Sequence, residues 1–317
     1  MEAFNHYIRD LGISVIITTY NSERFIDRCL NSVLNQKFPS LEVIVVDGNS
    51  KDSTIDKVKK YESSGFVKCF VIDGHVHVAR NKGIEVAKND IIIFLDPDDE
   101  LIEGSLQFIS RKFGELGNKY GVVYAYSIDD DGNLQGFRLD EEGPINFNDF
   151  ICEKIRYGNC FAAFKREAIK PLKFEVPGYE FMLHKRVVHK YGGYFIPIPL
   201  LRYHNKANPS SLSKQVSKIG FKKRYGSQIA LALSRYLVEF KGYFINNCPE
   251  TYARLCLHTG VLFMFNGLKV DALRMFVEAL KYGVTIRALF YCLLVLFVPT
   301  NFLVRFYESK EKSKSIK

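Results

Sequence analysis

Two aspartates flank a proline in Asp96-Pro97-Asp98, which directly follows the apolar run from Ile91 to Leu95. If that run is a buried strand, the rigid turn after it presents both carboxylates at the end of the strand. Carboxylate oxygens are the hard ligands that Mg²⁺ and Mn²⁺ prefer, and such an ion could bridge a diphosphate. It would then stabilise charge on a departing phosphate group as a Lewis acid. A D-x-D tripeptide is common by chance, so a solvated acidic turn is the competing interpretation.

A second D-x-D lies in Asp129-Asp130-Asp131-Gly132 and indicates something different. Its Asp-Gly pair is bounded by alternating apolar and polar residues around Ile128 and Leu134, a pattern typical of a hairpin turn. We therefore predict a turn there and not a metal site.

Polar clusters also follow two earlier apolar runs, at Thr19-Tyr20-Asn21 and at Asp47-Gly48-Asn49-Ser50. Strands separated by helical patterns indicate a wound, parallel sheet, in which ligands bind outside the carboxyl ends of the strands. The three polar clusters are therefore expected to converge at one edge. The dinucleotide fingerprint G-x-G-x-x-G is absent after the first strand. The predicted strands are 13–18, 41–46, 67–72 and 91–95, and the predicted helices lie around 25–34, 55–61 and 79–87.

The pattern changes after residue 121, where strands and helices no longer alternate at short spacing. A break rich in Asn, Ser and Pro follows at 205–213, and residues 214–282 have a largely helical character. We predict three parts: a catalytic domain at 1–212, a helical region at 213–282 and an apolar, basic segment at 283–317. Within the first part, strands are expected at 121–127, 161–165 and 194–198, and a helix at 180–191.

Four segments together resemble the family 2 glycosyltransferases of the GT-A fold, in order and in spacing, over about residues 12–212. They are Ser14 to Asn21, Val46 to Thr54, Ala79 to Gly83 and Phe94 to Asp99. The resemblance implies an α/β fold with a wound mixed sheet flanked by helices, here followed by a smaller C-terminal helical region. It also implies a nucleotide-sugar donor, UDP- or GDP-linked, a divalent cofactor, Mn²⁺ or Mg²⁺, and inversion at the anomeric carbon.

The resemblance also implies roles for residues on the donor side of the site. Asp98 would bind the metal, and Arg80 would lie near the base or the diphosphate. Asp47 could instead cap the next helix, and Arg80 could be a surface cation. The chain departs from the family at Gly48-Asn49, where Asp-Gly is more usual. The residues expected to contact the nucleoside are Thr19 and Tyr20 at the nucleobase pocket, Asp47 as an acceptor from the base, and Asp96 at the ribose.

The general base is expected at the start of a helix in the acceptor half, where the family usually carries an acidic pair. Here Tyr179 stands in place of the first acid and Glu180 in place of the second. A carboxylate there could take the proton from an attacking acceptor hydroxyl, and the helix N-terminus would favour its ionised form. Glu180 is the predicted base. Glu175 and Asp99 are the alternatives, and loss of activity is another.

His204 follows the last predicted strand of the catalytic domain. By resemblance to the family, a polar residue near this point reaches the metal or the diphosphate, and a neutral imidazole suits Mn²⁺. A single histidine is as readily structural, so both interpretations of His204 stay open.

Charge is divided unevenly between the two ends of the chain, whose net charge is +9. Residues 1–212 hold 27 Lys and Arg against 29 Asp and Glu, and residues 213–317 hold 17 against 6. The basic third predicts an anionic partner surface. Nucleic acid is not expected, because no aromatic-basic module accompanies the charge.

Residues 288–304 carry no charge but include Pro299, and at 17 residues the run is marginal for a membrane span. An interfacial helix on an anionic membrane surface is the preferred interpretation, with packing in a homodimer or against the core as the alternative. The basic tail beyond it contains Lys310, Lys312, Lys314 and Lys317. Residues 1–12 do not resemble a signal peptide, so we expect a cytoplasmic protein, peripheral on the inner face of the cell membrane.

The seven cysteines are scattered and none forms a C-x-x-C pair. The sequence therefore predicts free thiols rather than a disulfide framework or a zinc site.

The function predicted is transfer of a sugar to a glycan or lipid-linked acceptor. A sugar-phosphate nucleotidyltransferase would need a Gly-rich, basic loop after the first strand, which Thr18 to Ser22 lacks. A catalytically silent relative that binds a nucleotide or serves as a scaffold at a membrane complex is the remaining alternative, and Glu180 separates it from an active enzyme.

Overall fold

The computed structural model describes residues 11–137, 139–155, 158–204, 219–283, 285–298 and 302. These residues form two compact units, and each is described by itself. The first unit contains Ile155–Pro177, Leu183–Asn208 and the chain up to Phe150; the second contains Ile151–Lys154, Gly178–Met182 and Pro209–Lys317. The predicted boundary at residue 212 lies outside the described residues.

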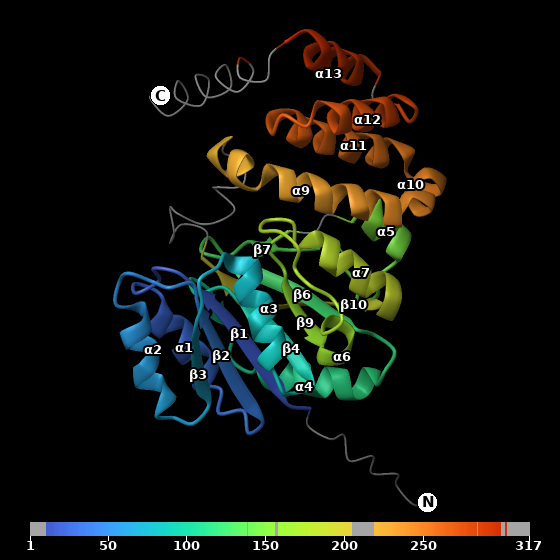
Figure 1. Cartoon of the computed structure of the whole chain (residues 1–317). Helices are drawn as coiled ribbons and strands as arrows, with labels where there is room; N and C mark the ends of the chain where they lie inside the picture. Colours follow the sequence, from blue (N-terminus) through green and yellow to red (C-terminus); the bar gives the residue numbers. More distant parts are fainter. Residues whose placement is uncertain are drawn as a thin grey trace, which may run out of the picture. The chain divides into compact units, whose positions relative to one another are not determined.

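The described part of the first unit carries ten strands in one mixed sheet, in the order β3-β2-β1-β4-β9-β6-β10-β5 (Figure 1). The strands β3, β2, β1 and β4 run parallel, whereas β9 is antiparallel to both of its neighbours. Two short strands pair off this path, β7 with β6 and β8 with β10. The bounds are β1 Ile13–Thr19, β2 Leu41–Asp47, β3 Val67–Val71, β4 Ile91–Leu95, β5 Glu100–Leu101, β6 Val122–Asp129, β7 Leu134–Gln135, β8 Gly143–Pro144, β9 Phe161–Lys165 and β10 Gly193–Tyr203.

Helices cover both faces of this sheet because its central strands are apolar on both sides. One core contains side chains of α1, α2 and α4 packed on one face, and a second core contains side chains of α3, α6 and α7 on the other. The prediction of an α/β wound mixed sheet flanked by helices is therefore confirmed. The helices are α1 Ile26–Leu34, α2 Thr54–Glu62, α3 Val76–Val86, α4 Ser105–Leu116, α5 Phe147–Ile151, α6 Arg166–Ile169 and α7 Phe181–Tyr191.

Strand register brings the three polar clusters to one edge, as expected from the sequence. Thr19 is the partner of Asp47 at the ends of β1 and β2, and Ile17 is the partner of Leu95 at the end of β4. The second D-x-D is a hairpin turn between β6 and β7, with Ile128 paired to Leu134, as predicted.

The second unit is helical, which confirms the predicted C-terminal helical region. Helix α11 packs against α9 and α12, and α12 packs against α13. The contact between α11 and α12 is close at Gly260, because a Cβ atom there would lie 2.4 Å from the Phe276 ring. The bounds are α9 Ile219–Glu239, α10 Lys241–Asn247, α11 Pro249–Phe265, α12 Lys269–Leu280 and α13 Thr285–Phe297.

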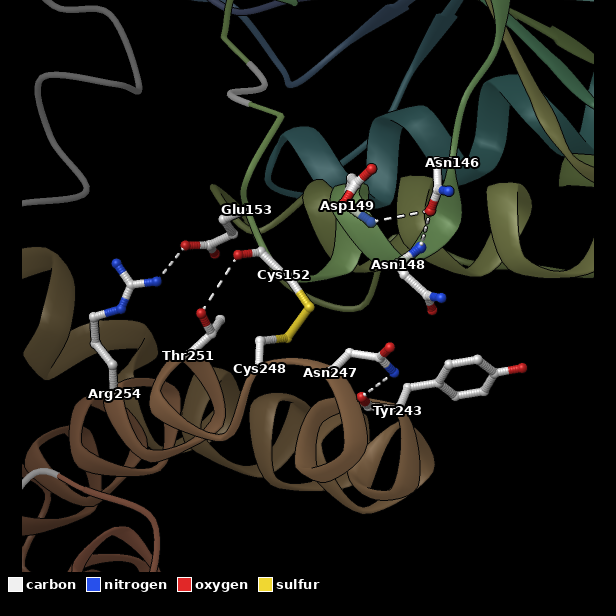
Figure 2. Close-up of a disulfide and its surroundings, with 10 residues drawn as sticks. All are labelled: Asn146, Asn148, Asp149, Cys152, Glu153, Tyr243, Asn247, Cys248, Thr251 and Arg254. Carbon is white, nitrogen blue, oxygen red and sulfur yellow. Dashed lines mark hydrogen bonds and ion pairs between the residues drawn. A yellow bond between two sulfur atoms is a disulfide. The ribbon is translucent and has the colours of Figure 1, made fainter.

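A disulfide joins Cys152 to Cys248 within the second unit, and the prediction of free thiols is wrong for these two residues (Figure 2). The partners are 96 residues apart, a separation at which no spacing pattern reveals a pair, and their Cα atoms lie 5.6 Å apart. Two further contacts join the same segments: Thr251 donates to the Cys152 carbonyl, and Arg254 forms an ion pair with Glu153 at 2.6 Å. The other five cysteines are free, as predicted.

Among the described residues, no helix is both long and apolar enough to cross a membrane. Helix α13 covers part of the predicted apolar run. The basic tail with Lys310, Lys312, Lys314 and Lys317 lies outside the described residues.

Candidate functional site

The first polar loop is built around the buried carboxylate of Asp47. Thr19 Oγ1 donates to Asp47 Oδ2 at 2.7 Å, and Ser50 donates to the same carboxylate through its backbone N–H and its hydroxyl. Asp47 is fully buried. In this arrangement the carboxylate fixes the turn after β2. A contact to a nucleobase, as predicted for Thr19 and Asp47, would have to use the remaining lone pairs.

Tyr20 lies at the same edge and is the exposed member of this loop, with 62% of its surface accessible. A Cβ atom on Gly48 would lie 3.2 Å from the Gly74 carbonyl oxygen, so the unusual glycine in the next loop makes room for the backbone of Gly74, whereas contact with Tyr20 Cδ2 at 3.5 Å would be ordinary. An exposed aromatic ring at the carboxyl edge offers a flat surface for stacking, which suits its predicted place beside a base.

Arg80 and Asp96 form an ion pair, with Nη2 of Arg80 3.1 Å from Oδ1 of Asp96. The Arg80 side chain is mostly buried and lies over the Phe174 ring at 5.4 Å, whereas the Asp96 side chain is half exposed. Asn81 holds Phe174 in place, because its amide donates to the Phe174 carbonyl and accepts from the Phe174 N–H. A fixed guanidinium therefore lies beside the acidic turn.

The acidic turn is closed by a hydrogen bond from Asp99 N to Asp96 O. Arg28 Nη2 donates to the carbonyl of Asp98 at 2.7 Å, which holds the backbone of the turn from the side of α1. Asp99 itself is buried and accepts from the backbone N–H of His204. Burial, followed by the charge of Asp96, raises the pKa of the Asp99 carboxyl to about 8. Negative charge is thus crowded at this turn.

His204 bridges two carboxylates. Its Nδ1 lies 2.6 Å from Oδ1 of Asp130 and its Nε2 lies 2.7 Å from Oε1 of Glu100, and its side chain is 12% exposed. Both ring nitrogens are therefore engaged, and His204 joins the end of β10 to β5 and to the β6–β7 turn. Metal binding by His204 stays a prediction, and it would require one of these two bonds to break.

The residues of the acidic turn fit a divalent cation. Asp96 and Asp98 offer hard oxygen atoms at an accessible edge, and a cation would relieve the crowding that raises the pKa of Asp99. Among the described residues, no three His, Cys, Asp or Glu side chains form a cluster that could hold an ion. Mg²⁺ and Mn²⁺ commonly bind one or two carboxylates together with phosphate oxygens and water.

Glu180 directly precedes α7, which begins at Phe181, so the predicted helix start is correct within one residue. Its Oε1 accepts from the backbone N–H of Gly178 at 3.2 Å. Of the two alternative bases, Glu175 is paired with Arg186 at 2.6 Å and Asp99 is buried. Glu180 belongs to the second unit, together with Gly178–Met182.

Several residues that shape the site were not predicted from the sequence. Arg28, Asn81, Glu100 and Asp130 all contact residues from other elements, and the partners lie 70, 93, 104 and 74 residues away in the sequence. No spacing pattern connects such partners. Asn81 alone had a signal, because it lies in the segment that carries the family resemblance.

A family model described as Glycosyl transferase family 2 matches residues 14–191, which is more than half of the chain. The chain belongs to this family. The match begins in β1 and ends with α7, so it contains the loops after β1, β2 and β4 and the segment with Glu180, whereas His204 lies beyond it.

A GalNAc(5)-diNAcBac-PP-undecaprenol beta-1,3-glucosyltransferase of Campylobacter jejuni is 30% identical to this family 2 chain over 171 residues. That alignment covers 51% of this chain and 54% of the relative. The chain therefore spans about half the length of this curated relative.

Two solved structures share the fold of this family 2 chain. TarS of S. aureus in complex with UDP-GlcNAc has a TM-score of 0.62 at 17% identity, covering 86% of this chain and 81% of that one. A mannosyltransferase of Pyrobaculum calidifontis in complex with GDP-Man and Mn²⁺ has a TM-score of 0.50 at 18% identity, covering 94% and 84%. The fold predicted from the sequence, GT-A followed by helices, is confirmed.

Proposed function

We propose that this chain is a metal-dependent, inverting glycosyltransferase that moves a sugar from a nucleotide-sugar donor to a hydroxyl of a glycan or lipid-linked acceptor. The observation that carries this proposal is the acidic turn Asp96-Pro97-Asp98 at the carboxyl edge of the sheet, paired with the fixed guanidinium of Arg80. Family membership supports this proposal. Two proteins of the same fold have been solved in complex with a nucleotide sugar, one with UDP-GlcNAc and the other with GDP-Man and Mn²⁺.

On the donor side, Thr19 and Tyr20 line the nucleobase pocket, where Tyr20 supplies a stacking surface, and Asp47 accepts from the base through its remaining lone pairs. Asp96 receives the ribose, and Arg80 turns from Asp96 toward the diphosphate, whose charge competes for the guanidinium. Asp98, with His204 as a further candidate ligand, holds Mn²⁺ or Mg²⁺. When bound, this ion supplies Lewis-acid stabilisation of the leaving nucleotide.

On the acceptor side, Glu180 accepts the proton of the acceptor hydroxyl as that oxygen attacks the anomeric carbon. The attack comes from the face opposite the leaving diphosphate, so the configuration inverts. If Glu180 does not act in this way, the chain is a silent relative that binds nucleotide without turnover, which is the second candidate function. Tyr179 in place of the family's first acid is the observation that favours it.

Calorimetry with UDP and GDP, with and without Mn²⁺, tests the metal role of Asp98. Asp98→Asn is expected to weaken Mn²⁺-dependent binding by about tenfold or more, because one carboxylate ligand is lost. Asp131→Asn in the exposed β6–β7 turn is the matched control, since it changes the other D-x-D, and it is expected to bind as the wild type does. Equal binding by Asp98→Asn in the presence of Mn²⁺ would refute the assignment.

We further propose that the chain works as a cytoplasmic protein on the anionic inner face of the membrane, through α13. The side chains of Ile286, Phe290 and Phe297 are 82%, 57% and 77% exposed. Leu289 and Leu293 are also exposed, and the five recur at helical spacing, so one face of α13 is apolar and open. The excess of Lys and Arg in residues 213–317 favours an anionic surface as the partner of this face.

Co-sedimentation with lipid vesicles tests this membrane role. The double variant Ile286→Ser/Phe290→Ser is expected to bind phosphatidylglycerol-containing vesicles about tenfold more weakly or worse, since each large apolar side chain contributes about 1.5–3 kcal/mol when buried. The control is Val238→Ser/Val270→Ser, which removes exposed apolar side chains from α9 and α12. Equal binding by both double variants would contradict the proposal, and dissociation of a dimer by the α13 variant alone would favour the homodimer alternative.

A further inference from the structure

The segment that carries Glu180 is anchored to the C-terminal helices on both sides of the carboxylate. Tyr179 Oη lies 2.8 Å from Nε2 of His258 on α11, and the two rings are stacked with an interplanar angle of 21°. On the other side, the Phe181 ring meets the Tyr236 ring of α9 edge-on at 5.8 Å, and Tyr236 is fully buried. Accordingly, Gly178–Met182 belongs to the second unit, although the chain before and after it belongs to the first.

The backbone between these anchors is also fixed. Gly178 has a positive φ of 76°, which few residues other than glycine adopt, and its N–H donates to the Glu180 carboxylate. Met182 N donates to the carbonyl of Tyr179, which closes a turn around Glu180. A carboxylate with an anchored aromatic residue on each side has few alternative positions.

The protonation of the Tyr179–His258 pair is consistent with a stable, neutral hydrogen bond. Burial raises the pKa of Tyr179 to about 12, so its phenol keeps the proton. Burial, followed by the charge of Lys222, lowers the pKa of His258, so its imidazole is neutral at physiological pH. The two groups therefore share a hydrogen bond between neutral partners, in which the tautomer of His258 decides which group donates.

We propose that Tyr179 and His258 are positioning residues for Glu180, so that the C-terminal helices set the geometry of the base. The inference rests on the proposed function, in which Glu180 accepts the acceptor's proton. Tyr179 stands where the family has the first acid of the pair. Its side chain anchors the segment that carries the second acid, Glu180. The pair acts through Glu180 and is not itself expected to contact the reacting atoms.

Kinetics of three variants test this proposal, using nucleoside diphosphate release from UDP-GlcNAc, UDP-glucose and GDP-mannose with Mn²⁺. Tyr179→Phe removes the hydroxyl and keeps the ring, and His258→Leu removes the imidazole that the hydroxyl is bonded to. Each is expected to lower kcat about 10- to 100-fold, as misplacement of a catalytic group does, while donor affinity in calorimetry stays the same. The double variant is expected to be no slower than the slower single variant, because both lose one hydrogen bond. His258→Gln, which retains an acceptor, is expected to restore most of kcat.

Tyr252→Phe is the matched control, because it removes a phenol from the same helix and a hydrogen bond to Glu278. It is expected to change the melting temperature but not kcat. The inference is overturned if Tyr179→Phe and His258→Leu keep the wild-type kcat while Glu180→Gln is inactive, or if Tyr252→Phe lowers kcat equally. A Glu180→Gln variant with wild-type kcat would overturn Glu180 as the proposed base and, with it, the positioning role. The kcat of this variant therefore distinguishes failure of the proposed function from failure of the positioning proposal alone.

Discussion

The exposure and the protonation of each carboxylate in the acidic turn depend on the residues around it and not only on its own type. Asp96, Asp98 and Asp99 are adjacent carboxylates, yet Asp99 is buried with its pKa raised to about 8, while Asp96 is half exposed beside Arg80. Burial, followed by the charge of Asp96, therefore favours the neutral form of the Asp99 carboxyl. Arg28 holds the backbone of the turn at the Asp98 carbonyl, and the backbone N–H of His204 holds the Asp99 carboxyl.

The stability of the first unit is expected to depend on pH through His184. This residue is buried and lies 3.0 Å from the phenol of Tyr124, and burial, followed by the charge of Arg80, lowers its pKa to about 3. Below the unfolded-state pKa of about 6.5, the unfolded chain binds a proton that the folded chain does not. The free energy of unfolding therefore falls as pH falls from about 6.5 toward 3, by about 2 kcal/mol at pH 5 from this group.

Urea unfolding at pH 7 and pH 5 measures this effect. His184→Gln, which keeps a hydrogen-bonding group, is expected to lose about 2 kcal/mol less than the wild type between the two values. The control His189→Gln removes an exposed histidine from the same helix and is expected to behave as the wild type. If the wild type and His184→Gln lose the same free energy, the neutral buried state of His184 is wrong.

At the scale of elements, the Cys152–Cys248 disulfide joins the end of α5 to the junction of α10 and α11. Closing a loop of 96 residues restricts the unfolded chain, which in the chain-entropy description is worth roughly 2–5 kcal/mol. Reduction, or Cys152→Ser, is therefore expected to lower the melting temperature of the second unit. Cys292→Ser, which removes a thiol of the second unit that is outside the disulfide, is the control and is expected to melt as the wild type does.

Alkylation of the unfolded, unreduced protein checks the bridge directly by mass spectrometry. Five of the seven cysteines are expected to react before reduction and all seven after it. Seven reacting cysteines without reductant would contradict the disulfide.

The elements predictable from the sequence are those whose signal is local. Apolar runs such as Ile13–Thr19 and Ile91–Leu95, separated by helical spacings, predict the parallel half of the sheet and the edge where its loops converge. The length of β10 was underestimated, because it extends to Tyr203 through register shifts at Ile196, Pro199 and Leu201 that break a simple alternation.

Contacts between distant segments could not be predicted in this way. His204 meets Glu100 and Asp130, Tyr179 meets His258, and Cys152 meets Cys248 only after the chain has folded. No sequence pattern links any of these residues to its partner, because each role comes from tertiary packing. The convergence of the strand-end loops was therefore predictable from the sequence, whereas the anchoring of the segment with Glu180 was not.

At the scale of the whole molecule, the two compact units are not two consecutive stretches of the chain, because each contains several separate segments. The family match ends at residue 191, yet within it Gly178–Met182, with the proposed base, belongs to the C-terminal unit. The C-terminal helices are therefore expected to matter for turnover as well as for membrane association. Removing them would leave Tyr179 and Phe181 without His258 and Tyr236.

Release of nucleoside diphosphate from UDP-GlcNAc, UDP-glucose and GDP-mannose, with Mn²⁺ or with EDTA, tests the central claim most directly. The account predicts Mn²⁺-dependent release from at least one donor by the wild type. It also predicts release at least about 100-fold slower for Glu180→Gln, as loss of a general base costs about 10²–10⁴-fold, with donor binding retained. Equal release by the wild type and Glu180→Gln, or release unaffected by EDTA, would contradict it.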